Sequence, residues 1–233
     1  MAVWSEQLRE LAVDFFFPAR CIGCGKTGAF LCDSCLRALP RIAPPVCAKC
    51  GRPESTGALC PTCWGWQTQI DGIRSPFRFD GVIRQAVYEL KYRNLRAIAC
   101  CLAALLFGYL QANPVPGDVL AAVPLHIRRL RNRGYNQSSL IARELSKLTA
   151  LPMVEGCMIR VKDSPPQART ETVDQRRFNV VDAFSCVDQR FRGKRIVLLD
   201  DVCTSGATLD ACATVLKSAG AVSVWGLTLA RET

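Results

Sequence analysis

Residues 196–208 read IVLLDDVCTSGAT, and they decide both the fold class and the position of the candidate site. The apolar residues at the start predict a buried strand, and Asp200 and Asp201 follow it directly. In open α/β sheets, ligands bind beyond the carboxyl ends of the strands. The next residues, 204–206, are Thr-Ser-Gly, a small-residue turn that opens directly into a predicted helix. The order is therefore strand, acidic pair, turn and helix.

The residue types in this stretch indicate a site for a sugar phosphate. Backbone amides in a small-residue turn at a helix N-terminus converge on an anion, and nearby Ser and Thr hydroxyls add donors. Carboxylates, in contrast, accept hydrogen bonds from sugar hydroxyls. Taken singly, the acidic pair fits a Mg²⁺ or phospho-acceptor cluster, and the turn fits an ordinary helix N-cap. Their combination favours a sugar phosphate bound by Asp200, Asp201, Thr204, Ser205, Gly206, Ala207 and Thr208.

Segments with strand and helix periodicity alternate on both sides of this stretch. Such alternation predicts an α/β fold, with a mostly parallel sheet flanked by helices. A polar loop is expected at 164–179, and a short amphipathic helix at 1–17. The predicted strands are 76–79, 119–124, 158–161, 195–199 and 222–229, and the predicted helices are 82–92, 95–111, 136–148 and 207–219.

A cysteine-rich module precedes this domain. Eight of the 14 cysteines form four C-x2-C pairs, with seven residues between the first two pairs and nine between the last two. Because four thiolates complete one tetrahedral zinc site, eight can hold two structural Zn²⁺ ions. Free thiols or redox pairs are the alternative. Ligation by neighbouring pairs is preferred, with interleaving left open. The expected ligands are Cys21, Cys24, Cys32, Cys35, Cys47, Cys50, Cys60 and Cys63.

We therefore predict two domains, an N-terminal helix with a double zinc ribbon at 1–70 and a second domain at 71–233. One motif inside the ribbon is misleading, because residues 23–28, GCGKTG, match a dinucleotide-binding pattern and the end of a P-loop. No strand precedes this motif, and Cys24 is needed by the metal. Lys26 and the glycines are interpreted as turn residues of a zinc knuckle.

Length and composition exclude several classes of protein. With 233 residues, 49% of them hydrophobic, the chain can bury a core without disulfides. Its longest apolar run, 97–110, has 14 residues, whereas a membrane-spanning helix needs about 18 or more. The N-terminus also lacks the pattern of a secretory signal. We therefore expect a cytoplasmic protein without a membrane span.

The formal net charge of +10 comes entirely from residues 76–195, where 20 basic minus 10 acidic side chains leave +10. This excess fits a protein that handles an anion, although a solvated basic face is the alternative. Arg128, Arg131 and Arg133 follow the strand predicted at 119–124, where a pyrophosphate loop would lie. They fit equally well a solvated helix start or a nucleic-acid contact.

Other basic residues lie away from the acidic pair in sequence, and they suit single-stranded DNA as a second ligand. Aromatic side chains that could stack on bases are scarce, so modest and sequence-tolerant binding is expected. The basic residues are Arg190, Arg192, Lys194 and Arg195, and the aromatic candidates are Trp64, Trp66 and Tyr135. His126, the only histidine, is interpreted as a loop residue, and Cys203 as a packing residue.

The apolar strand, Asp-Asp, variable pair and Thr-Ser-Gly-x-Thr of 196–208 closely resemble the type I phosphoribosyltransferase signature. Together with the cysteine module, the wider sequence resembles the ComF family, in its competence-protein and GntX-like branch, over essentially the whole chain. The blocks that carry this resemblance are Leu90-Lys91-Tyr92, Val123-Pro124-Leu125 and Arg133-Gly134-Tyr135-Asn136-Gln137, with support from Gln167, Arg176, Asn179 and Ala183-Phe184.

The resemblance implies a type I phosphoribosyltransferase-like fold with an N-terminal zinc-ribbon module. It implies that Asp200 and Asp201 contact the ribose hydroxyls of phosphoribosyl pyrophosphate, that 204–208 holds the 5′-phosphate, and that Mg²⁺ arrives with the diphosphate. It also implies a role in natural transformation, with imported single-stranded DNA and the DNA-uptake machinery as partners. The alternative is a non-catalytic nucleic-acid-binding accessory protein that uses the phosphoribosyl site as a ligand sensor. No residue identifies a catalytic group or the acceptor of the ribosyl group.

Overall fold

The computed structural model describes residues 18–162, 182–187 and 189–232. The helix expected at 1–17 and the polar loop expected at 164–179 lie outside these residues, as do Gln167, Arg176 and Asn179. The described helices are α2 (Asp33–Arg37), α3 (Gly81–Tyr92), α4 (Ile98–Ala112), α5 (Ile127–Arg133), α6 (Gln137–Thr149) and α8 (Ala207–Ser218). The described strands are β1 (Gly72–Arg74), β2 (Phe77–Arg78), β3 (Val119–Ala122), β4 (Met158–Arg160), β5 (Phe184–Cys186), β6 (Arg195–Cys203) and β7 (Ser223–Arg231).

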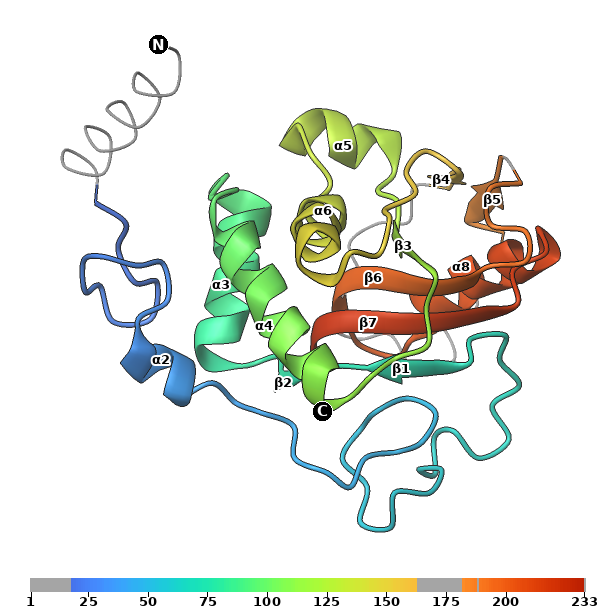
Figure 1. Cartoon of the computed structure of the whole chain (residues 1–233), viewed down its shortest axis with the longest axis horizontal. Helices are drawn as coiled ribbons and strands as arrows, with labels where there is room; N and C mark the ends of the chain where they lie inside the picture. Colours follow the sequence, from blue (N-terminus) through green and yellow to red (C-terminus); the bar gives the residue numbers. More distant parts are fainter. Residues whose placement is uncertain (1–17, 163–181, 188, 233) are drawn as a thin grey trace.

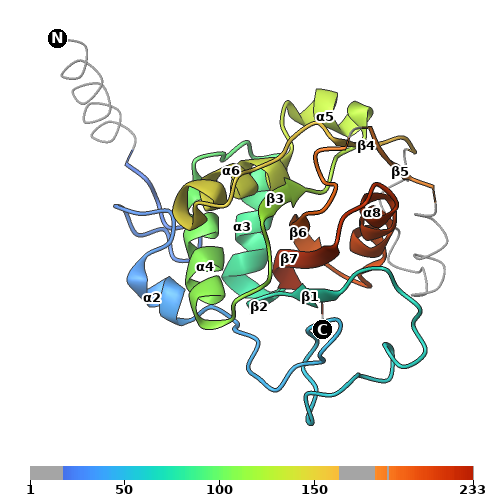
Figure 2. The same ribbon diagram turned by 45° about the vertical axis from the view of Figure 1, so that its right-hand side comes forward.

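A parallel sheet forms the centre of the molecule, with the strand order β1-β7-β6-β3 and with β2 also paired to β7. Helices α3, α4 and α6 cover one face, and α8 covers the other (Figures 1 and 2). Side chains along β6 alternate between the two cores. Val197 and Leu199 pack with the residues of α3, α4 and α6, whereas Ile196 and Leu198 pack with those of α8. A strand with both faces buried gives the unbroken apolar run of a parallel sheet.

The expected mostly parallel sheet with flanking helices is confirmed, but several boundaries differ. Strand β6 continues through Cys203, so the acidic pair lies on the strand itself. Strand β4 pairs antiparallel with β5 in a separate two-stranded sheet, and no sequence pattern predicted β5 as its partner. Among the described residues, no helix has the length and apolarity needed to cross a bilayer.

Hydrogen bonds hold the start of α6 and the end of α3 near the carboxyl end of the sheet. Asn136 caps α6 by accepting a hydrogen bond from the backbone N–H of Ser138. Its side-chain amide also donates to the carbonyl of Val123, 2.9 Å away, just beyond β3. The Tyr135 hydroxyl donates to the carbonyl of Leu90 in α3. These bonds hold the start of α6 and the end of α3 beside the carboxyl ends of β3 and β6.

The cysteine-rich segment lies along the outside of this domain. The part around α2 packs beside α3, and residues 40–70 pass under β1 (Figure 1). Backbone bonds fix the second part to the sheet, because the N–H of Ile73 in β1 donates to the carbonyl of Lys49 at 2.7 Å. The expected domain boundary at residue 70 stays a prediction.

Candidate functional site

The acidic pair at the end of β6 is held by contacts from two helices. The Lys91 ammonium, at the end of α3, lies 2.8 Å from Oδ2 of Asp201. The Ser138 hydroxyl, in the first turn of α6, donates to Oδ1 of Asp200 at 3.0 Å, and the backbone N–H of Asp201 donates to the same oxygen at 2.9 Å. The two carboxylates therefore have fixed and different partners.

Burial changes the protonation of this group of residues. Burial, together with the neighbouring Asp201 carboxylate, raises the pKa of Asp200 to about 7, although the Lys91 ammonium opposes the shift. For Lys91, burial by itself would lower the pKa, but the attraction of Asp201 outweighs it and raises the pKa. The site thus holds a tight ion pair beside a carboxyl group that titrates near neutral pH.

The turn after β6 has the form expected from the sequence. Gly206 has a φ of 85°, in the left-handed region, and the helix α8 begins at the next residue. Thr204, Ser205 and Thr208 are half-buried. Ser205 uses its hydroxyl oxygen to accept from the backbone N–H of Ala207 at 3.4 Å.

The structure also gives a reason for glycine at position 206. A Cβ there would lie 2.9 Å from Cδ1 of Ile73 and 3.0 Å from the ring of Trp66, closer than carbon atoms pack. Neighbouring protein atoms and the positive φ require glycine at this position.

A hollow lined by cations adjoins the acidic pair on the α3 and α5 side. Its volume is about 510 Å³, and Lys91 is part of its wall. Arg133 lines it as well, with its guanidinium 5.6 Å from the centre of the Tyr92 ring and bonded to Gln137. Arg96 and Arg129, which sequence reasoning did not single out, complete the basic lining.

The candidate pyrophosphate arginines are therefore distributed differently from the sequence expectation. They lie on the short helix α5, not on a loop, because His126 caps a helical turn by accepting from the N–H of Arg128 at 3.4 Å. Arg133 lines the hollow, while Arg128 and Arg131 lie on the exposed face of α5. Sequence reasoning also missed Lys91 as a site residue, although it belongs to a block that carries the family resemblance.

Several residues expected at a DNA surface have other contacts. Arg195 makes a two-pronged ion pair with Asp118, with Nη2 2.6 Å from Oδ1. Arg190 donates to the carbonyl of Glu155 at 2.9 Å. Tyr135 is only 7% exposed, and the Arg96 guanidinium lies 4.4 Å from the centre of its ring. The expectation that Tyr135 could stack on a base is wrong. Trp64, which is 80% exposed, is available for stacking.

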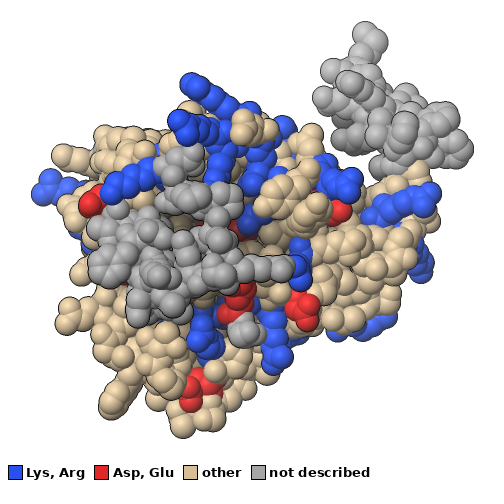
Figure 3. All heavy atoms as spheres, turned by 180° about the vertical axis from the view of Figure 1, so that it is seen from behind, with Lys and Arg blue, Asp and Glu red and all other residues tan. Residues whose placement is uncertain are grey.

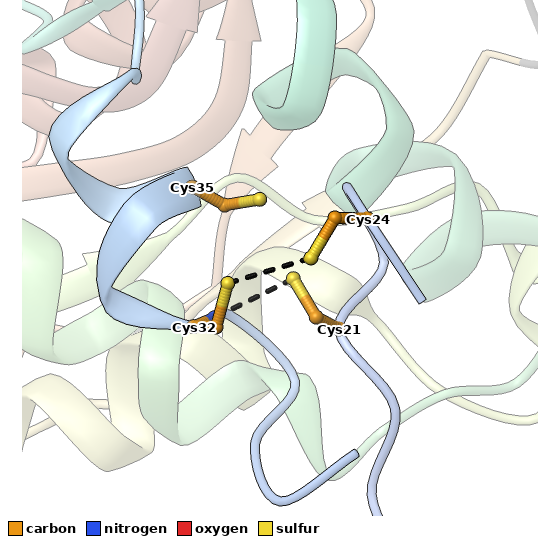
Figure 4. Close-up of side chains that lie close together, drawn as sticks. All are labelled: Cys21, Cys24, Cys32 and Cys35. Carbon is orange, nitrogen blue, oxygen red and sulfur yellow. Dashed lines mark hydrogen bonds between the residues drawn. The ribbon is translucent and has the colours of Figure 1, made fainter. Parts of the chain in front are cut away.

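The cysteines form two separate clusters, each made by neighbouring C-x2-C pairs. In each cluster the four sulfur atoms lie within 4.8 Å of one another, and neighbouring pairs are grouped as the preferred local ligation requires. Figure 4 shows the four side chains of the first cluster pointing toward a common centre. Four thiolates converging in this way fit a tetrahedral Zn²⁺ ion. The clusters are Cys21, Cys24, Cys32 and Cys35, and Cys47, Cys50, Cys60 and Cys63.

Local backbone geometry agrees with the zinc-knuckle interpretation of residues 23–28. The N–H of Cys21 donates to the carbonyl of Lys26 at 2.8 Å, and the N–H of Gly25 donates back to the carbonyl of Cys21 at 2.7 Å. Lys26 therefore belongs to a tight turn around the metal site. Cys203, which is 3% exposed, packs in the core as expected.

Comparison with known proteins shows the family. Residues 12–65 match the model of the double zinc ribbon domain. The DNA utilization protein YhgH of Salmonella typhi is 30% identical over 206 residues, which cover 84% of this chain and 89% of that protein. The chain belongs to the ComF family. Competence protein ComFC of Bacillus subtilis is 29% identical, and the match covers 87% of this chain and 84% of that protein. Competence protein F of Haemophilus influenzae is also 29% identical, and the match covers 91% of this chain and 97% of that protein.

Solved structures also resemble this ComF chain in fold. A glutamine phosphoribosylpyrophosphate amidotransferase from B. subtilis gives a TM-score of 0.40 at 24% identity, covering 57% of this chain. The match spans only 26% of that longer protein. An adenine phosphoribosyltransferase from Thermoanaerobacter pseudethanolicus gives a TM-score of 0.36 at 16% identity, covering 63% of this chain and 84% of its own.

The two clusters should each hold one metal ion. Elemental analysis of the purified protein should give about two zinc ions per chain, because each site takes four thiolates. Cys24→Ser and Cys60→Ser should each lower the content by about one. Cys100→Ser, which removes an exposed cysteine outside both clusters, should leave it unchanged. A folded protein without metal would contradict the assignment.

The raised pKa of Asp200 predicts a dependence of stability on pH. Because the native carboxyl group holds its proton more tightly than the unfolded one, the protein loses stability as the pH rises from about 4 through about 7. Asp200→Asn keeps both acceptor bonds at Oδ1 without the buried charge. We expect it to raise Tm by a few degrees at pH 8 and by much less at pH 5, since 1 kcal/mol corresponds to about 2–4 °C.

Asp118→Asn is the matched control for this measurement. The Arg195 guanidinium lowers the pKa of Asp118 to about 2, so this carboxylate stays ionised across the whole range from pH 5 to 8. Its replacement should change Tm by the same amount at both pH values. An Asp200→Asn effect equally independent of pH would show that this carboxyl group does not titrate near neutrality.

Proposed function

We propose that this ComF-family protein binds phosphoribosyl pyrophosphate with Mg²⁺ at the carboxyl end of β6, and that it acts in handling imported single-stranded DNA. The observation that carries the ligand assignment is the position of the Lys91–Asp201 ion pair. Lys91 contacts the acidic pair at 2.8 Å and also lines the cationic hollow. Carboxylates for a sugar and cations for a diphosphate therefore adjoin one another.

Each part of the ligand has a matching part of the site. In the proposed complex, Asp200 and Asp201 accept hydrogen bonds from the ribose hydroxyls. The turn at 204–206 and the first residues of α8 hold the 5′-phosphate, aided by the positive end of the helix dipole. The pyrophosphate extends toward Lys91 and Arg133, with Arg129 and Arg96 further along the hollow. Arg128 and Arg131 remain candidates for its outer edge.

Mg²⁺ fits this arrangement as a companion of the diphosphate. It retains several waters and is commonly bound through substrate phosphate oxygens and one or two carboxylates. In this site the carboxyl groups are those of Asp200 and Asp201, of which Asp201 is already paired with Lys91. The bound metal would neutralise part of the diphosphate charge.

The reaction class proposed is pentosyl transfer. When the bond from ribose C1 to the pyrophosphate oxygen breaks, its electron pair leaves with pyrophosphate, and an acceptor forms the new bond at C1. Positive charge grows on the sugar ring, next to the carboxylates, while negative charge grows on the leaving group, next to the cations. Fixed charges placed in this way stabilise the transition state.

The proposed role in DNA handling is supported by the family and by the surface charge. Relatives in the family are a DNA utilization protein and competence proteins. Lys and Arg side chains gather on the face shown in Figure 3, notably toward the end of the molecule where Figure 1 places α5. Arg192 and Lys194 are also exposed, but they precede β6 at its amino end and form a separate basic cluster. The uptake machinery is the partner proposed for this role.

A second function remains to be distinguished, in which the protein binds single-stranded nucleic acid and uses the phosphoribosyl site only as a sensor. The observation that favours it is the exposure of Arg128 and Arg131, which face solvent outside the hollow. The two functions differ in the fate of the ligand. A transferase releases pyrophosphate when an acceptor is present, while a sensor returns phosphoribosyl pyrophosphate unchanged.

Calorimetric titration tests the ligand assignment. Phosphoribosyl pyrophosphate should bind in the presence of Mg²⁺, and Asp200→Asn with Asp201→Asn should weaken it by at least tenfold, since each charged hydrogen bond contributes about 1.5–3 kcal/mol. Asp201→Asn by itself should also lower Tm, because it leaves Lys91 without its partner. Asp118→Asn, on the opposite end of the sheet, should bind as the wild type does. Unchanged affinity in a folded double variant would refute the assignment.

Salt dependence tests the DNA proposal. Single-stranded DNA should bind with a log-log salt slope of several units, of which each phosphate contact accounts for about 0.7. Replacing Arg128 and Arg131 by Gln should lower the slope by about 1.4 if both contact phosphates. Arg192→Gln with Lys194→Gln tests the second basic cluster in the same way, and Trp64→Ala should weaken binding by loss of stacking. If no binding is detected at low salt, the exposed cations form only a solvated surface and the DNA proposal is wrong.

A further inference from the structure

Arg231 connects the second cysteine cluster to the phosphate loop, residues 203–206. Its side chain is 1% exposed, although it carries a full positive charge. One end of the guanidinium donates to the carbonyl of Cys50, a member of the second cluster. The other end donates to the carbonyl of Thr204 in the loop at 3.4 Å. One planar group therefore spans the two features.

The chemistry of arginine suits this position. Residue 231 ends β7 and is paired in register with Cys203, the last residue of β6, so its side chain begins beside the loop. A guanidinium has donors in a rigid fork and stays charged when buried. Four thiolates around Zn²⁺ carry a net charge of about −2, which a buried cation complements. The position therefore uses both the positive charge of Arg231 and the forked arrangement of its donors.

Trp66 forms a second connection. It follows Cys63 closely, and its backbone N–H donates to the Cys63 carbonyl at 3.1 Å. Its side chain packs against the second cluster. The far edge of the same ring lies against Gly206, where an added Cβ would come within 3.0 Å. The indole thus fills the space between the cluster and the turn that begins α8.

The chain leaving the ribbon is also tied to α8. Asp210, in the first turn of that helix, accepts from the backbone N–H of Gln69 at 2.8 Å and of Ile70 at 3.0 Å. It also accepts from the hydroxyl of Thr68. The first cluster has a different environment, since Gly23 within it packs against Val82 of α3. Figure 1 shows that segment beside α3, apart from the second ribbon.

We propose that the metal-filled second cluster holds the phosphate loop in its binding conformation, with Arg231 and Trp66 as the positioning residues. The proposal rests on the proposed function in that the ligand of the loop is phosphoribosyl pyrophosphate. Because the two sites share these contacts, zinc at the second cluster and ligand at the loop stabilise each other. Such coupling is reciprocal, so each ligand raises the affinity of the protein for the other, and this appears as slower release where the association rate is unchanged.

Hydrogen–deuterium exchange of the zinc-loaded full chain tests the positioning role without any ligand. Amides of residues 203–210 should exchange faster in Arg231→Met than in the wild type. Arg74→Met is the matched control, because Arg74 donates to the ribbon carbonyl of Ala48 at 3.1 Å while its guanidinium stacks over Trp225, away from the loop. It should leave exchange at 203–210 unchanged. Trp66→Ala serves as the second variant should Arg231→Met fail to fold.

Zinc release to a chromophoric chelator tests the coupling. Phosphoribosyl pyrophosphate with Mg²⁺ should slow the release of one of the two ions by about fivefold or more, within the usual range for coupled sites. The protected ion should be the one that remains in Cys24→Ser. Arg231→Met should retain both ions but lose the protection and bind the ligand at least tenfold more weakly. Arg231→Lys, which keeps the charge without the fork, should be intermediate.

The outcomes separate this proposal from the proposed function. If Arg231→Met keeps wild-type exchange at 203–210, the positioning role is overturned whether or not the ligand binds. If the wild type binds phosphoribosyl pyrophosphate and both zinc ions leave at unchanged rates, the coupling is overturned. If the wild type does not bind the ligand, the proposed function fails, and faster exchange in Arg231→Met still supports the positioning role.

Discussion

Two adjacent carboxyl groups at the end of a strand buried on both faces are the constraint on which this structure depends. Burial disfavours both charges, and each charge disfavours the other. The ion pair between Lys91 and Asp201 stabilises one of them, while Asp200 keeps a raised pKa. Helix α3 must therefore end beside β6, and α6 must begin at the same place, with Ser138 in its first turn. The arrangement of helices on this face follows from what the acidic pair needs.

The same constraint explains why the sugar-phosphate site and the cationic hollow adjoin. Lys91 cannot reach Asp201 unless the end of α3 lies close to the carboxyl edge of the sheet. The Tyr135 hydroxyl bonded to the carbonyl of Leu90 holds this helix end, and the ring of Tyr135 in turn lies under Arg96. Contacts that stabilise the fold thus also place cations around the cationic hollow. Binding chemistry and stability share one set of residues here.

Sequence reasoning predicted what depends on local patterns. Three patterns depend only on residues close together in the sequence: the apolar run before Asp200, the Thr-Ser-Gly turn and the C-x2-C spacing. The sheet, the loop and the local grouping of the zinc ligands could therefore be predicted. Lys91, Arg96 and Arg231 could not, because their roles come from partners far away in the chain. Periodicity also could not decide whether Arg128 and Arg131 belong to a pyrophosphate loop or to a solvated helix start, and the structure places both on the exposed face of α5.

The strand order has a consequence for synthesis of the chain. Strand β7 is the last strand in sequence, yet it lies between β1 and β6 in the sheet. Each cysteine cluster, in contrast, closes over a short stretch and can fill with metal as soon as that stretch leaves the ribosome. N-terminal segments generally fold first during synthesis. The ribbons can therefore form before the sheet, while the complete sheet and the Arg231 contact to Cys50 must wait until β7 has emerged.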